Sequence, residues 1–245
     1  MHARHSPSGH TRLGLFAAAL LAFVPLLAAA AEPRAFSADY DVFQDDTRIG
    51  KGRITLRRLP DGNWQMVTRS EATEGLLAMA GMRREETSVI GWSGAQPVSL
   101  DYRMQQQAAW KERRQELKVD PGRGTATSRY KGESVALGYR PDLLDKHAVT
   151  AALMSELAAG RRGEMEFAVA GRRSVEIQRY RTAANVRLRT ALGVERAIRV
   201  ERLREGDNAR VTKIWFARNR GWLPLRIKQY ESDGSTLDLR ITAIR

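Results

Sequence analysis

The alternation of apolar and polar residues in short segments constrains this chain most. Phe36, Ala38 and Tyr40 alternate with polar residues, which is the period-two pattern of a half-buried strand. Similar segments follow almost to the C-terminus, separated by turn sequences such as Pro60–Asn63 and Asp233-Gly234. Short strands at this spacing predict an antiparallel sandwich or barrel. We therefore expect a mainly β fold.

One segment departs from this pattern. Residues 142–159 are rich in helix formers and contain no Gly or Pro. Val149, Leu153 and Leu157 recur every four residues, which predicts a helix with one apolar stripe. Gly160 follows at the position where helices commonly end. We expect one main α-helix at about 142–159.

The N-terminal segment has the features of a secretory signal peptide. Met1–Arg12 is polar and positive, Leu13–Ala28 is apolar, and Ala28–Ala31 supplies the small residues of a cleavage site. An uncleaved membrane anchor is the alternative, and the alanine run disfavours it. No cysteine follows the apolar stretch, so attachment of a lipid there is not expected. We predict a signal peptide at 1–31 and a single periplasmic β-rich domain at 32–245, with no transmembrane span after cleavage.

The histidine and cysteine content of the chain excludes thiol chemistry and the common zinc sites. The chain has no cysteine, and three of its four histidines lie in the predicted signal peptide, which leaves only His147. One histidine cannot build the common zinc sites, and a Ser-His-Asp triad could form only around it. A lone helical histidine is more often a packed or capping residue than a catalyst. Glu85 and Glu86 are adjacent on a strand and so point to opposite faces. We expect no catalytic residues, no metal ligands and no cofactor.

An apolar segment, Gly75–Met82, interrupts the strands between charged flanks. We interpret it as an apolar loop or short helix that is either a plug closing one side of the core or the rim of an apolar cavity. Trp110 has the most polar surroundings of the five tryptophans and is the one expected at the surface. The candidate ligand-binding residues are Leu76, Leu77, Met79, Met82 and Trp110.

The formal net charge of +13 favours anionic partners. For an exported protein these would be phospholipid headgroups, lipopolysaccharide or anionic glycans, and nucleic acid is not expected. The alternative explanation is that the arginines simply cover solvated strand faces.

Several ordered elements together resemble a known family. They are the Tyr40 strand leading into Ile49-Gly50-Lys51-Gly52, the helix after Tyr139-Arg140-Pro141-Asp142, the Ala191-Leu192-Gly193 turn, the Ile214-Trp215-Phe216-Ala217 strand, the Trp222–Ile227 segment and the final hairpin. This order resembles the exported bacterial family catalogued as domain of unknown function 3108. The resemblance implies a periplasmic, strongly curved antiparallel sheet or open β-barrel, similar to the open barrels of lipoprotein carriers, and it brings no catalytic residues.

Three functions are compatible with the sequence. The leading hypothesis is a non-enzymatic periplasmic protein that binds a lipid or other apolar ligand in the curved sheet and supports maintenance of the cell envelope. The alternative is an envelope scaffold or protein-interaction module with a filled core. A glycan-acting hydrolase is the third, and it requires two carboxylates brought together across a cleft by the fold. An interior cavity above about 300 Å³ would favour ligand binding over scaffolding.

Overall fold

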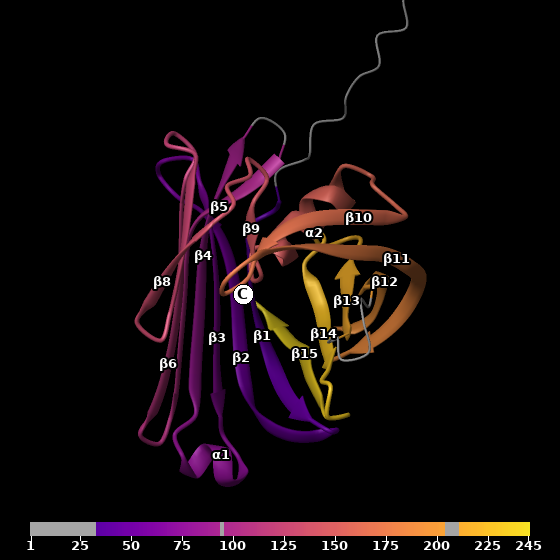
Figure 1. The fold of residues 1–245 in the computed structure, drawn as a ribbon. Helices are drawn as coiled ribbons and strands as arrows, with labels where there is room; N and C mark the ends of the chain where they lie inside the picture. Colours follow the sequence, from indigo (N-terminus) through magenta and orange to yellow (C-terminus); the bar gives the residue numbers. More distant parts are fainter. Residues whose placement is uncertain (1–32, 94–95, 204–210) are drawn as a thin grey trace, which may run out of the picture.

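The computed structural model describes residues 33–93, 96–203 and 211–245, and the predicted signal peptide lies outside them. The described chain forms a single curved sheet of fifteen strands, which confirms the mainly β fold (Figure 1). The strands are β1 (Phe36–Gln44), β2 (Thr47–Arg58), β3 (Trp64–Ala72), β4 (Arg83–Ser93), β5 (Gln96–Ala108), β6 (Lys111–Asp120), β7 (Thr125–Tyr130), β8 (Glu133–Leu137), β9 (Leu144–Asp145), β10 (Glu164–Ala170), β11 (Val175–Thr190), β12 (Gly193–Arg202), β13 (Val211–Ala217), β14 (Pro224–Tyr230) and β15 (Thr236–Ile244).

Two antiparallel meanders make up this sheet, and the pairing of the first strand with the last joins them. The strand order runs from β8 down to β1, crosses to β15, and continues down to β9. Within the described residues the pairing of β9 with β10 is the one parallel contact. The first and last strands of the described chain therefore meet at the centre of the sheet, and β8 and β9, which follow each other in sequence, lie at its two edges.

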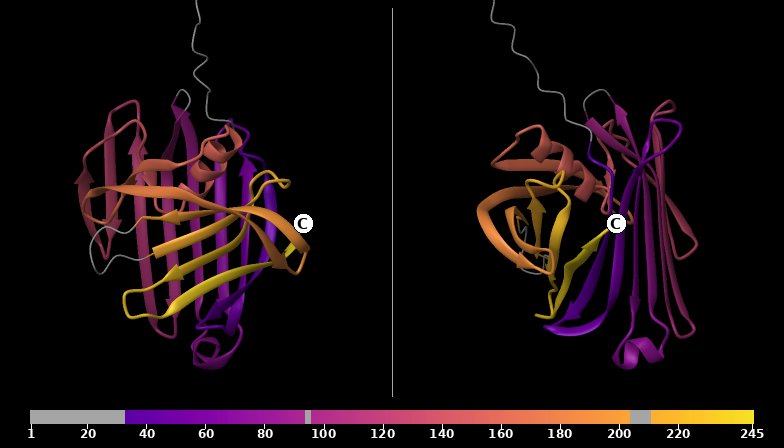
Figure 2. Two further views of the ribbon diagram at one scale, coloured as in Figure 1. Left: turned by 90° about the vertical axis from the view of Figure 1, so that its right-hand side faces the viewer. Right: turned by 180° about the vertical axis from the view of Figure 1, so that it is seen from behind.

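The sheet folds over at this central pairing, so that its halves face each other as two layers. Strands β1–β8 form a broad wall, and β10–β15 curl across its inner face (Figures 1 and 2). Register shifts occur on both sides of β1, between Asp39 and Tyr40 against β15 and between Val42 and Phe43 against β2. Such bulges bend a strand and increase its twist, which allows the sheet to fold over at this point.

The outer face of the β1–β5 wall carries charged rows that cross the strands. One such row runs directly across five successive strands, through Asp39, Arg53, Arg69, Glu85 and Gln105. The Arg53–Asp39 and Arg69–Glu85 ion pairs lie along this row, at N···O distances of 2.6 and 2.8 Å. The alternate residues of the same strands face the core, so the period-two pattern of the sequence marks the two faces correctly.

The main helix, α2 (Val149–Ala158), is shorter than the sequence pattern predicts. The expected first turns at 142–148 are instead strand β9 and a turn, because Leu144 and Asp145 pair with β10. Burial also differs from the single predicted stripe. Buried residues occur around the whole helix, which lies between the two layers (Figure 1). Gly160, at φ +87°, ends the helix as expected.

Two strands have a weak local pattern or an irregular register. In β8 only two of the five residues, Val135 and Leu137, are large and apolar. Residues 175–190 form one long strand, β11, whose register against β12 shifts between Thr182 and Ala184. The apolar segment contains the short helix α1 (Gly75–Met79), in the connection between β3 and β4.

The core lies between the layers and is centred on α2. Ala152, Leu153, Met154 and Leu157 have no exposed surface, and they share one cluster with side chains of both meanders. A second, smaller cluster joins β5–β8 to the β9–β10 region through residues such as Leu143. The helix therefore packs against both halves of the folded sheet and stabilises their contact.

Truncation of Leu153 to alanine tests this role. Because the side chain is fully buried at the centre of the cluster, Leu153→Ala should lower the free energy of unfolding by about 2–5 kcal/mol in urea denaturation. The control Val194→Ala, at a position 62% exposed, should change it by less than about 0.5 kcal/mol. Equal effects of the two substitutions would contradict the central placement of α2.

Candidate functional site

A cavity of about 520 Å³ remains between the two layers below α2. One wall comes from β2–β4, the opposite wall from β11–β15, and Val149 and Thr150 of α2 lie at the inner end. Much of the lining is aliphatic. These side chains are Val42, Ile49, Ile54, Met66, Leu77, Met82, Val149, Ile214, Ile227, Leu237 and Leu239.

The other part of the lining is polar and charged, so the cavity is amphipathic. Arg84, Glu86 and Lys146 line it on the side towards β5, together with Gln106 and His147. A cavity of this size with apolar walls and a few convergent polar groups is the usual form of a small-molecule site.

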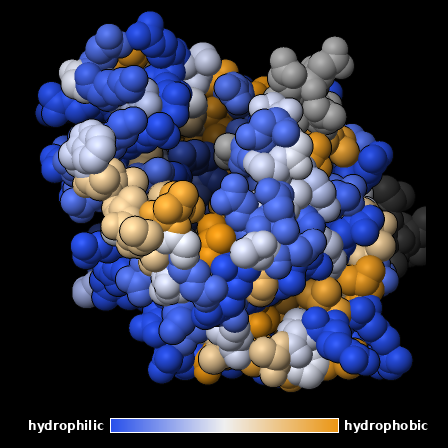
Figure 3. Space-filling model, turned by 90° about the horizontal axis from the view of Figure 1, so that it is seen from below, coloured by the Kyte–Doolittle hydropathy of each residue, from blue (hydrophilic) through white to orange (hydrophobic). Residues whose placement is uncertain are grey.

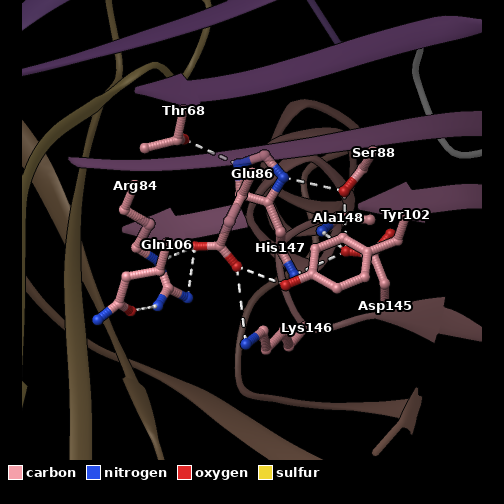
Figure 4. Close-up of polar contacts among 10 residues, drawn as sticks. All are labelled: Thr68, Arg84, Glu86, Ser88, Tyr102, Gln106, Asp145, Lys146, His147 and Ala148. Atoms are coloured by element: carbon pink, nitrogen blue, oxygen red, sulfur yellow. Dashed lines mark hydrogen bonds and ion pairs between the residues drawn. The ribbon is translucent and has the colours of Figure 1, made fainter. Parts of the chain in front are cut away.

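Glu86 is the centre of this polar region (Figure 4). Its carboxylate accepts hydrogen bonds from the Tyr102 hydroxyl at 2.6 Å and from Arg84 Nε at 3.0 Å, and Lys146 Nζ lies 3.7 Å away. Burial favours the neutral acid, but the charges of Arg84 and Lys146, the charge of His147 when it is protonated at low pH, and the hydrogen bond from Tyr102 outweigh it and lower the pKa of Glu86 to about 2. The group is therefore a carboxylate at neutral pH and cannot act as a general acid.

His147 lies immediately before α2 and is held by strands β3 and β4. Its Nε2 lies 2.8 Å from Thr68 Oγ1 and its Nδ1 lies 2.9 Å from Ser88 Oγ. The Ser88 hydroxyl donates its own proton to Asp145, so its oxygen accepts from Nδ1–H, and Nε2 then accepts from Thr68. Burial lowers the pKa of His147, in keeping with this neutral form.

Asp145 is a fully buried carboxylate that fixes the start of α2. One oxygen accepts from the Ser88 hydroxyl and from the backbone N–H groups of His147 and Ala148, at 2.8–2.9 Å. The other accepts from Ser99 at 2.7 Å. Burial raises the pKa of Asp145, and the hydrogen bonds from Ala148, Ser99 and Ser88 to the carboxylate oppose that effect.

The trio of Ser88, His147 and Asp145 does not have the geometry of a catalytic triad. Ser88 lies between the acid and the histidine, whereas in a triad the histidine lies between the acid and the serine. Ser88 also has no exposed surface and so cannot meet a substrate. The network instead attaches the β9–α2 connection to β3, β4 and β5.

The structure divides the sequence-predicted ligand residues into two groups. Leu77 and Met82 line the cavity. Leu76, Met79 and Trp110 do not, and their side chains are 81%, 85% and 88% exposed. Ligand binding by either group remains a prediction.

Sequence reasoning missed the polar region around Glu86, although one signal was present. Glu85 and Glu86 do point to opposite faces, as expected: Glu85 pairs with Arg69 on the outer wall and Glu86 faces the cavity. The same alternation places Arg84 beside Glu86. No sequence pattern indicates that Tyr102 and Lys146 belong to this polar region, because only the folded sheet brings them close to Glu86.

Among residues 33–93, 96–203 and 211–245, no cluster of three or more His, Cys, Asp or Glu side chains is placed to hold a metal ion. In the same ranges, no helix has the length and apolar character needed to cross a membrane.

A family model, described as a protein of unknown function (DUF3108), matches residues 37–242, which is most of the chain. The chain belongs to the DUF3108 family. This match confirms the resemblance drawn from the ordered sequence elements. No curated protein matches this DUF3108 chain.

A solved structure similar to this DUF3108 protein supports the fold, and a second one aligns more weakly. A β-barrel-like protein of the domain of unknown function DUF1849 from Brucella abortus aligns with a TM-score of 0.56 and 10% identity, covering 88% of this chain and 98% of that one. The MucA/MucB complex of Pseudomonas aeruginosa aligns with a TM-score of 0.36 and 13% identity, covering 89% of this chain but 54% of that one. At these identities the similarity concerns the fold alone.

The substitution Glu86→Gln tests the electrostatics of the polar region. Because the folded pKa of about 2 lies below the ordinary 4.5, Glu86 contributes stability that is complete above pH 4.5 and is lost as the pH falls towards 2. This difference corresponds to ~3 kcal/mol. The variant should be less stable than the wild type by about this amount at pH 7, and the gap should shrink between pH 4.5 and 2.

The neighbouring residue provides a matched control. Glu85→Gln removes a carboxylate from the exposed outer face and should cost less than about 1 kcal/mol at any pH. Urea denaturation at a series of pH values measures both variants. A gap for Glu86→Gln that does not change with pH would refute the assigned role of its charge.

Proposed function

We propose that this protein is a non-enzymatic binding protein of the bacterial cell envelope that holds an amphipathic lipid in the cavity between its two layers. The observation that carries the proposal is the amphipathic cavity of about 520 Å³. The predicted signal peptide supports a periplasmic location for residues 32–245.

The distribution of side chains around the cavity suggests how the ligand would lie. An acyl chain would contact the aliphatic wall around Met66, Ile214 and Leu239, where burial of apolar surface favours binding. A polar head would lie towards Lys146 and Arg84, which offer hydrogen-bond donors and positive charge. Lys146 has the more open side chain of the two, at 41% exposed, and is suited to a headgroup that reaches solvent.

The interior also bears on the two alternative functions. A filled core would have favoured a scaffold, and the cavity exceeds the volume at which ligand binding becomes the better explanation. A glycan hydrolase would need a protonated carboxylic acid opposite a second carboxylate. Of the three glutamates that line the cavity, Glu86 does not fit the role of the acid, because its neighbours keep it ionised.

Filling the cavity provides the test. Ile227→Trp places a large side chain among the apolar lining and should weaken the binding of a fluorescent fatty acid more than about tenfold, as measured by titration. The control Ile177→Trp adds the same bulk at an exposed position of β11 and should leave the affinity unchanged.

Native mass spectrometry of the purified exported protein provides a second test, because it detects a bound lipid directly. The wild type should carry a lipid that Ile227→Trp lacks. Absence of any bound lipid, together with no response to the fluorescent fatty acid, would overturn the proposed function.

A further inference from the structure

The end of the molecule that carries α1 has an apolar surface that folding does not explain. Leu76 and Met79 of α1 and Trp110 of the β5–β6 turn are each more than 80% exposed. No residue of α1 is buried, so this helix adds nothing to the core. Figure 3 shows this end from below, where apolar side chains gather in patches and the surface is hollowed beside them. Exposed large apolar groups concentrated in one place mark contact sites.

The two chain segments that carry these side chains are fixed to each other. The Ala109 backbone N–H donates to the Ala80 carbonyl at 2.5 Å and thereby links the β5–β6 turn to the end of α1. Ala109 holds a φ of +50°, which is unfavourable for a residue other than glycine. The turn thus keeps Trp110 at the tip beside α1 in spite of a local conformational cost.

The charges around this surface are positive and therefore complement a negatively charged partner. Lys111 and Arg113 follow Trp110 and are exposed, and neither forms an ion pair with any residue in the described parts of the chain. Two of the acids nearby are already engaged: Glu74 pairs with Arg48, and Glu112 pairs with Arg114. Positive charge therefore accompanies the apolar tip.

We propose that this tip, formed by Leu76, Met79 and Trp110 with Lys111 and Arg113, docks onto a membrane surface that contains anionic lipid. Insertion of a few large apolar side chains at the level of the headgroups, with cations beside them, is the usual physical basis of reversible interfacial binding. A tryptophan is favoured at this depth because its ring has both apolar and polar edges.

The position of the tip relative to the cavity gives the docking a consequence. Leu77 and Met82, from the same segment as Leu76 and Met79, line the cavity, so its α1 end would face the bilayer. A lipid could then pass between membrane and cavity with little exposure to water. This route rests on the proposed function, whereas the docking itself does not.

Flotation with lipid vesicles tests the docking. The wild type should float with vesicles of phosphatidylglycerol and phosphatidylethanolamine, and less with vesicles of phosphatidylcholine alone. The triple variant L76S/M79S/W110S should bind the anionic vesicles at least about tenfold more weakly, because the inserted apolar surface is gone. The variant K111Q/R113Q should lose the preference for anionic lipid and the sensitivity of binding to salt.

Controls separate docking from folding and from cavity binding. Val194→Ser removes an exposed apolar side chain from the start of β12 and should float like the wild type. Ile227→Trp, which fills the cavity, should also still float. The triple variant should unfold at the same urea concentration as the wild type and still bind the fluorescent fatty acid from solution.

Failure of the wild type to float, or flotation of the triple variant at the wild-type level, would overturn the docking and leave the cavity result standing. Normal flotation by a wild type that binds no fatty acid would instead overturn the proposed function and leave the docking standing.

Discussion

The pairing of β1 with β15 is the contact on which the rest of the structure depends. It joins the two ends of the described chain over seven residue pairs, from Ala38 opposite Ile244 to Gln44 opposite Leu237, and so makes one sheet of two meanders. The sheet bends over at this pairing, next to the register shift between Asp39 and Tyr40. Tyr40 itself is buried, and its hydroxyl donates to the Pro224 carbonyl at 2.6 Å, which ties the bend to β14. This pairing, together with the packing of α2 between the layers, sets the relation of the two layers and the space between them.

The connection that enters the space between the layers is fixed by polar rather than apolar contacts. Asp145 receives hydrogen bonds from Ser88 on β4 and Ser99 on β5, and it also holds the backbone at the start of α2. A buried carboxylate is costly unless its oxygens are satisfied, and here each of them accepts hydrogen bonds. This network holds the helix at one end of the interior, and the unfilled remainder is the amphipathic cavity.

Sequence pattern predicted most strands because alternation and turn chemistry are local properties. The exceptions have tertiary causes. Residues 142–148 have helix propensity, but Leu144 and Asp145 are more stable as a parallel partner of β10. The helix α2 is buried on all sides because two layers enclose it, although its sequence indicates one stripe. At the candidate site, the sequence pattern identified the apolar segment at 75–82 as a candidate for ligand binding. It did not predict the polar region, because Tyr102, Lys146 and Glu86 come from separate elements and no local pattern encodes their proximity.

The sequence by itself determined the antiparallel β fold and the narrow range of chemistry open to a chain with no cysteine and one histidine outside the predicted signal peptide. It did so because periodicity, turn residues and composition can be read without knowing which strands meet. The order of its elements also indicated the family, whose resemblance implied the curvature of the sheet. Only the tertiary structure decided that the interior holds a cavity, that Ser88 is buried between Asp145 and His147, and that α1 and Trp110 share one exposed tip. These features depend on how far the sheet folds over and which hairpins then lie side by side. That is set by the long-range pairing of β1 with β15 and by the placement of α2.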